Sequence, residues 1–238
     1  MFSFDSKVRY SEVDRNCKME IASIIDYFQD CCCFQSESLG VGVKYANETG
    51  CAWLLNSWQI VIPEFPTYLD EITISTWPYA FDRIYGYRNF TIKSKSGKML
   101  AMANSNWIYV NLDTASLVKL TPQITDVYPI EPKLTEMSYE ARKITIPTEF
   151  VAYAPCTVEA HQIDTNHHMN NAQYIKLAQN YLPEDFKIWQ MRVEYKKQAL
   201  LGDILIPRIT LTEQQCTVAL VNTDGKPYCI VEFSKRLT

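Results

Sequence analysis

Asp164-Thr165-Asn166-His167-His168-Met169-Asn170-Asn171 is the stretch that decides the fold of this chain, because a weaker copy of it occurs in the first half. The copy runs from Asp14 to Met19 and keeps the aspartate, the asparagine and the methionine in register. Cys17 and Lys18 stand there in place of the two histidines. We infer that the chain is an internal duplication in which one copy retained side chains that can transfer a proton.

The composition of the chain is typical of a folded protein with one large or two ordinary domains. Its 238 residues are 47% hydrophobic and 13% aromatic, which is enough to fill a core. The 23 basic and 27 acidic residues give a net charge of −4, which disfavours nucleic acid and anionic membranes as partners. No apolar run approaches the ~20 residues that a membrane helix needs, and no export signal is visible. We therefore expect a cytoplasmic protein without a membrane partner.

The eight cysteines favour reduced thiols over a disulfide framework, because the chain is long and lacks an export signal. Three of them are adjacent, at Cys31-Cys32-Cys33. No Cys-x-x-Cys pair occurs, so the spacing of a structural zinc site or of a thioredoxin-like redox pair is missing. We expect neither a metal nor an organic cofactor.

The order of the predicted elements repeats along the chain. In the first half a short strand near 7–12 precedes a helix over 20–39, and β-branched and aromatic runs predict strands at 53–62, 71–77, 85–93 and 99–111. In the second half a strand near 157–162 precedes a helix over 170–182, and strands are predicted at 189–199, 204–212, 217–222 and 228–234. Asp224-Gly225 predicts a type I′ turn in the last hairpin.

A segment interrupted by prolines, residues 119–147, separates the two halves and is interpreted as a linker. On each side of it, one helix is followed by an antiparallel series of strands. Such a series buries its apolar face by wrapping around the helix. The sequence therefore predicts an α+β fold built from two similar units.

The whole chain resembles the acyl-acyl carrier protein thioesterases of plants and bacteria, which are tandem hotdog folds. The family's second-half motif Asp-x-Asn-x-His-x-Asn-Asn-x-x-Tyr is matched by Asp164, Asn166, His168, Asn170, Asn171 and Tyr174. Similar stretches in the first half are Trp58-Gln59-Ile60-Val61-Ile62-Pro63, Ile74-Ser75-Thr76-Trp77, Arg88-Asn89-Phe90 and Ser105-Asn106-Trp107. The resemblance implies a double hotdog, with an amino-terminal unit at 1–118, the linker at 119–147 and a carboxy-terminal unit at 148–238.

The resemblance also implies that Asn166 and His168 are catalytic and that Asp164 supports them. The family usually carries Glu-Cys after Glu-Tyr-Arg-Arg, whereas this chain has Gln198 at the glutamate position. Gln198 can orient a water or bond to His168 but cannot accept a proton, so any step that needs a carboxylate there is in doubt. Glu194 is a poor substitute, because four residues of strand separate it from Gln198 by about 13 Å.

The residues alone leave two interpretations of the histidine motif open. Thioester hydrolysis requires an activated water or nucleophile, a donor for the oxyanion and a thiolate leaving group, and the imidazole of His168 can act as the base. Backbone amides at the helix start near Asn170 can help to bind the oxyanion. Alternatively, Asp, Asn and Thr before an apolar run are typical of any helix start, and adjacent histidines occur in solvated turns. The resemblance favours catalysis.

The resemblance further implies that the first hotdog holds the acyl chain, and candidate pocket residues are Ile24, Phe28, Cys32 and Trp53. Large apolar residues are core residues more often than ligand contacts, which is the alternative interpretation. The implied partner is an acidic acyl carrier protein, and candidate docking residues are Arg142, Lys143, Arg192, Lys196 and Lys197. A solvated strand face is the alternative for this basic group. The oligomeric state stays open, a homodimer included.

The predicted activity is hydrolysis of fatty acyl-acyl carrier protein, which releases a free fatty acid and ends fatty acid synthesis. A coenzyme A thioesterase of the same fold is one alternative. The other is a non-catalytic sensor of acyl thioesters, motivated by Gln198. A sensor needs an output module, and no basic DNA-reading helix lies outside the two repeats.

Overall fold

The computed structural model describes residues 1–236 and divides into two compact units. The first unit comprises Met1–Asn56 and Ile60–Tyr139, and the second comprises Ser57–Gln59 and the chain from Glu140 onward. The division after Tyr139 lies within the segment 119–147 that we interpreted as a linker. The domain boundaries drawn from the sequence remain a prediction.

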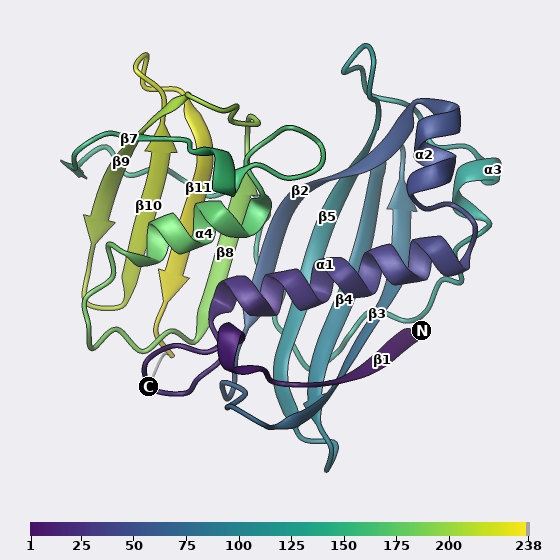
Figure 1. Cartoon of the computed structure of the whole chain (residues 1–238), viewed down its shortest axis with the longest axis horizontal. Coiled ribbons are helices and arrows are strands. Elements are labelled where there is room, and N and C mark those ends of the chain that lie inside the picture. Colours follow the sequence, from purple (N-terminus) through teal and green to yellow (C-terminus); the bar gives the residue numbers. More distant parts are fainter. Residues whose placement is uncertain (237–238) are drawn as a thin grey trace. The chain divides into compact units, whose positions relative to one another are not determined.

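The first unit is one long helix on an antiparallel sheet (Figure 1). Its strands are ordered β1-β3-β4-β5-β2. The bounds are β1 Phe2–Lys7, a 3-10 turn Tyr10–Glu12, α1 Ile21–Ser38, α2 Val43–Thr49, β2 Cys51–Val61, β3 Glu71–Asp82, β4 Tyr85–Ser94, β5 Met99–Asn111 and α3 Pro122–Thr125.

Helix α1 forms because its apolar residues recur at helical spacing and can be buried together on the sheet. Ile21, Ile24, Ile25 and Phe28 are fully or almost fully buried. The Phe28 ring lies 5.2 Å, centroid to centroid, from that of Phe90 on β4. These residues form the core between α1 and the sheet of the first unit.

The second unit repeats this arrangement with a shorter helix, α4, against its own strands (Figure 1). The strands are ordered β8-β11-β10-β9-β6, and β7 also pairs with β9. The bounds are β6 Val151–Ala152, β7 Cys156–Thr157, a 3-10 turn Ala160–Gln162, α4 Asn171–Gln179, β8 Gln190–Tyr195, β9 Ile204–Leu211, β10 Gln215–Val221 and β11 Pro227–Ser234.

Both short strands predicted before the helices are misplaced. The strand expected near 7–12 lies at Phe2–Lys7, and the strand expected near 157–162 is reduced to Cys156–Thr157. In each half the remaining residues form a 3-10 turn with a capping box: Glu12 accepts from the Arg9 amide at 2.8 Å, and Gln162 accepts from the Glu159 amide at 2.9 Å. Side-chain bonds to the local backbone therefore replaced strand pairing.

The type I′ turn predicted at Asp224-Gly225 is wrong. Gly225 has a positive φ of 79°, whereas Asp224 is not among the residues with positive φ, and a type I′ turn needs both. The side-chain oxygen of Asn222 accepts from the Asp224 amide at 3.1 Å and from the Lys226 amide at 2.8 Å. These bonds produce a longer hairpin loop.

Among residues 1–236, no helix is both long enough and apolar enough to span a lipid bilayer.

Candidate active site

The histidine motif forms a tight turn that is organised by Asp164. The carboxylate oxygen Oδ1 of Asp164 accepts from the Asn166 amide at 2.8 Å, and its carbonyl oxygen accepts from the His167 amide at 3.0 Å. The Asp164 amide donates to the carbonyl of His168 at 2.9 Å. His167 takes a left-handed φ of 62°, which closes the turn just before α4. Asp164 thus sets the backbone position of His168.

The first unit contains the same turn. The Asp14 side-chain oxygen Oδ1 accepts from the Asn16 amide at 2.8 Å, and the Asp14 carbonyl accepts from the Cys17 amide at 3.0 Å. The Asp14 amide donates to the carbonyl of Lys18 at 2.7 Å. Cys17 has a φ of 59°, matching His167. The duplication inferred from sequence therefore extends to individual hydrogen bonds, and the turn does not depend on histidine.

His168 is partly buried, whereas Asn166 and His167 are exposed. The imidazole nitrogen Nδ1 of His168 is buried and has no hydrogen-bond partner within the described part of the chain. Asp164 therefore shapes the turn and does not bond to that nitrogen. A buried ring nitrogen without a partner is unfavourable in the free protein, and a bound group that supplied the bond would be favoured.

The amides at the start of α4 are largely used within the chain. The Asn170 amide donates to the Gln162 carbonyl at 2.8 Å, and the Asn170 side chain caps the helix by accepting from the Ala172 amide at 2.8 Å. The Gln173 amide donates to the Asn170 carbonyl at 3.0 Å. These three donors hold the helix start and are not free to bind an oxyanion. A role for other amides of the helix start stays a prediction.

Gln198 lies in an exposed loop after β8, not on the strand predicted at 189–199, which ends at Tyr195. The strand ends because the amides of Lys196 and Lys197 both donate to the carbonyl of Tyr228, at 2.8 and 3.1 Å. Beyond Gln198, the buried Ala199 accepts from the Met169 amide at 2.8 Å. This bond joins the segment that carries Gln198 to the one that carries His168.

Tyr174 on α4 is a part of the site for which sequence reasoning found no role. Its hydroxyl oxygen accepts from the Ala199 amide at 2.9 Å. The motif includes this tyrosine, but a bond from a side chain to the backbone of a distant loop leaves no sequence signal.

Glu194 is a structural carboxylate in the second unit. It is 1% exposed and accepts from Arg142 Nη1 at 3.1 Å, from Lys196 Nζ at 2.5 Å and from the Ile144 amide at 3.2 Å. Arg192, another basic residue proposed for partner docking, lies 3.4 Å from Glu232. Three of the five predicted docking residues therefore have a carboxylate partner within the unit, which lowers the charge they offer to a partner.

The four predicted pocket residues all lie in the first unit. Ile24 and Phe28 are fully buried on α1, whereas Cys32 and Trp53 are partly exposed. The Trp53 ring packs 4.9 Å from that of Tyr109, and a side chain at Gly86 would meet the Trp53 ring at 3.0 Å. Their part in binding an acyl chain stays a prediction.

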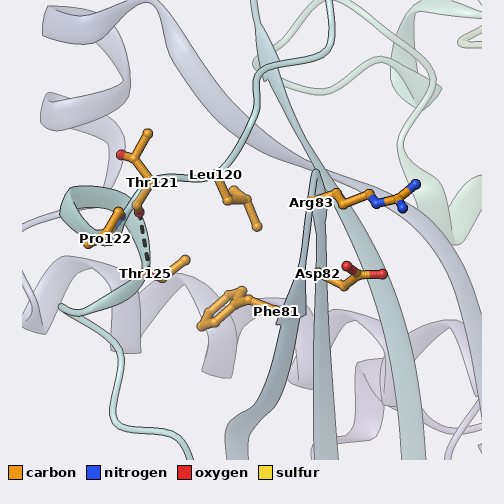
Figure 2. Close-up of a pocket in the computed structure, with 7 residues that line it drawn as sticks. All are labelled: Phe81, Asp82, Arg83, Leu120, Thr121, Pro122 and Thr125. Atoms are coloured by element: carbon orange, nitrogen blue, oxygen red, sulfur yellow. Dashed lines mark hydrogen bonds between the residues drawn. The ribbon is translucent and has the colours of Figure 1, made fainter.

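A pocket of about 240 Å³ lies in the first unit where β3 turns into β4 (Figure 2). Its lining residues are Phe81, Asp82, Arg83, Leu120, Thr121, Pro122 and Thr125. In Figure 2 the charged ends of Asp82 and Arg83 point away from Phe81 and Thr125. None of the predicted site residues lines this pocket.

Residues 1–128 match the profile of the acyl-ACP thioesterase N-terminal domain, and residues 148–233 match that of the acyl-ACP thioesterase C-terminal domain. The chain belongs to the acyl-ACP thioesterase family. Oleoyl-acyl carrier protein thioesterase 2 of Arabidopsis thaliana is 25% identical over 94% of this chain, and palmitoyl-acyl carrier protein thioesterase of Gossypium hirsutum is 23% identical over 90%. This family member spans 67% and 55% of the lengths of those two relatives, respectively.

Solved structures support the fold of this family member. An acyl-ACP thioesterase from Bacteroides thetaiotaomicron superposes with a TM-score of 0.86 at 23% identity, over 98% of this chain and 96% of that one. The 12:0-ACP thioesterase from Umbellularia californica gives a TM-score of 0.85 at 17% identity, over 99% and 96%. The predicted α+β tandem hotdog fold is confirmed.

Proposed function

We propose that this protein hydrolyses the thioester of fatty acyl-acyl carrier protein and releases a free fatty acid. The observation that carries the proposal is membership of the acyl-ACP thioesterase family across both halves of the chain. The turn that presents His168, whose Nδ1 is buried without a partner among the described residues, supports the same conclusion.

In this proposal His168 is the general base. It accepts a proton from a water molecule, and the resulting hydroxide attacks the thioester carbonyl. The thiolate of the carrier leaves readily, so no strong acid is required. Neither the attack nor the departure of the thiolate requires a metal or an organic cofactor. Asn166, exposed beside His168, has a side-chain amide that can donate to the carbonyl oxygen as it becomes negative.

Asp164 and Gln198 have supporting roles in this scheme. The carboxylate of Asp164 is engaged by the turn amide of Asn166, so its contribution is to hold the His168 backbone. Gln198 can orient the attacking water but cannot accept its proton. We therefore assign the proton-accepting step to His168.

We further propose that the amino-terminal unit binds the acyl chain, with Ile24, Phe28, Cys32 and Trp53 as the residues to test. The carrier protein is the proposed partner. Lys197 and Lys143, both exposed, are the stronger docking candidates, because Arg142, Arg192 and Lys196 are paired with carboxylates.

The test is thiol release from purified protein incubated with acyl-carrier-protein thioesters of several chain lengths. His168→Ala should abolish release, whereas Lys18→Ala, at the equivalent position of the first turn, should leave it unchanged. No release above buffer by the unsubstituted protein would reject the proposal. Tight binding without hydrolysis would favour a sensor, and a higher kcat/KM on matched coenzyme A thioesters would favour a coenzyme A thioesterase.

A further inference from the structure

We propose that Tyr174 is a positioning residue of the thioesterase site, because its hydroxyl oxygen holds the Ala199 amide and thereby fixes the loop that carries Gln198. This inference rests on the proposed function. It assigns to Tyr174 no contact with the substrate.

The Ala199 residue is held from two sides. Its amide donates to the Tyr174 hydroxyl oxygen at 2.9 Å, and its carbonyl accepts from the Met169 amide at 2.8 Å. Ala199 directly follows Gln198, and Met169 directly follows His168. One residue therefore couples the positions of both candidate catalytic side chains.

Tyr174 is itself rigidly held. Its side chain is buried, and its ring packs edge-on against Tyr195 with centroids 5.8 Å apart. Tyr195 in turn donates from its hydroxyl to the Asn171 carbonyl at 3.1 Å. Burial raises the pKa of the Tyr174 phenol well above its usual value, so the hydroxyl stays neutral at physiological pH. The acceptor for the Ala199 amide is thus fixed in place.

The first unit shows what the fold alone requires. There the Met19 amide donates to the Pro66 carbonyl at 2.8 Å, which is the equivalent of the bond from Met169 to Ala199. Proline has no amide hydrogen, and the position equivalent to Tyr174 is Ile24, which has no hydroxyl. Donor and acceptor are both missing from the copy that also lacks the catalytic histidine.

This correspondence favours positioning over a merely structural role. In the first unit Ile24 and Pro66 stand at the equivalent positions, and the bond from the Met19 amide to the Pro66 carbonyl forms there without a tyrosine hydroxyl or a donor amide. A tyrosine hydroxyl paired with an amide is therefore not needed to form the turn. It is found in the half where the loop carries Gln198 and is bonded through Ala199 to Met169, the residue that follows His168.

The first experiment measures kcat and KM for Tyr174→Phe on an acyl-carrier-protein thioester. We expect kcat to fall by about tenfold to a hundredfold, as for a small misplacement of catalytic groups, with KM unchanged. Tyr181→Phe makes the same chemical change at a partly exposed tyrosine of the same unit; it is the control and should behave as the unsubstituted protein. In a Gln198→Ala background the Tyr174→Phe change should cause little further loss of kcat.

The second experiment copies the first-unit pair with the double variant Tyr174→Ile, Ala199→Pro. This variant leaves no buried amide without a partner, so we expect its melting temperature to exceed that of Tyr174→Phe while kcat stays low. Recovery of kcat together with stability would overturn the proposal, as would an equal loss of kcat with and without Gln198. Absence of turnover in the unsubstituted protein would instead overturn the proposed function.

Discussion

Replacing Glu194 by alanine should destabilise the second unit by about 2–5 kcal/mol. The carboxylate is 1% exposed, whereas its partners Arg142 and Lys196 are 43% and 35% exposed and can be rehydrated. Each of these two ion pairs is therefore worth no more than about 0.5–1 kcal/mol. The Ile144 amide is different, because Ile144 is 2% exposed and its amide would lose its acceptor, at a cost of about 1–3 kcal/mol.

Urea unfolding at pH 7, followed by tryptophan fluorescence, measures this loss. Glu194→Gln is the matched control: it keeps an acceptor for the Ile144 amide and should lose only about 1 kcal/mol. A Glu194→Ala variant within about 0.5 kcal/mol of the unsubstituted protein would refute the reasoning. A thiol-release assay tests whether Glu194 also takes part in catalysis. A Glu194→Gln variant that is stable but shows no turnover would show that it does.

Three further predictions concern the loop that carries Gln198, the partly buried carboxylate of Glu232 and the strained turn at Leu69. Gln198→Glu should raise kcat at pH 7, because a carboxylate can accept a proton; a pH-rate profile without a new acidic limb would contradict it. Burial raises the pKa of Glu232 above 4.5 although Arg192 opposes the shift, so the native state holds its proton more tightly than the unfolded state. The stability of the protein relative to Glu232→Gln should then fall as pH rises from about 4 through the raised pKa, which urea titrations across that range can measure. Leu69 and Gly202 are equivalent, because their amides donate to the carbonyls of Val8 and Val158 at 3.1 and 3.0 Å; their φ angles are 72° and 85°. Leu69→Gly should therefore stabilise the protein by about 0.5–1 kcal/mol in thermal unfolding, and no gain would contradict the strain.

Local signals in the sequence predicted much of the fold. The helix expected at 20–39 was found at Ile21–Ser38, and the strand expected at 99–111 was found at Met99–Asn111. Both rest on periodic burial of apolar residues, which is visible in the chain itself. The 3-10 turns at Tyr10–Glu12 and Ala160–Gln162 were mistaken for strands, because their capping side chains compete with pairing in a way that periodicity does not reveal.

The candidate site was predictable where its members are close in sequence. Asp164, Asn166 and His168 lie in one turn, so the motif alone predicts that they are close together. The position of Gln198 did not follow, because the strand that carries Glu194 ends at Tyr195, so the two residues do not lie on one strand as the sequence predicted. The contact that ties this loop to α4 joins residues 25 positions apart, through a backbone amide that any residue but proline supplies.

The two halves separate what the fold needs from what the chemistry needs. Asp14 and Asp164 make the same turn with the same bonds, so this backbone was retained in both copies. The differences lie around the proposed catalytic position: Lys18 stands where the second copy has His168, and Pro66 and Ile24 stand where that copy has an amide bound to a hydroxyl. In the proposed mechanism the first turn has no imidazole to accept the proton, and a loop without a proposed catalytic side chain needs no hydrogen bond from a tyrosine to hold it. We therefore expect the proposed base and the hydrogen bond between the Ala199 amide and the Tyr174 hydroxyl to be lost together. This is why we attribute a positioning role to that hydrogen bond.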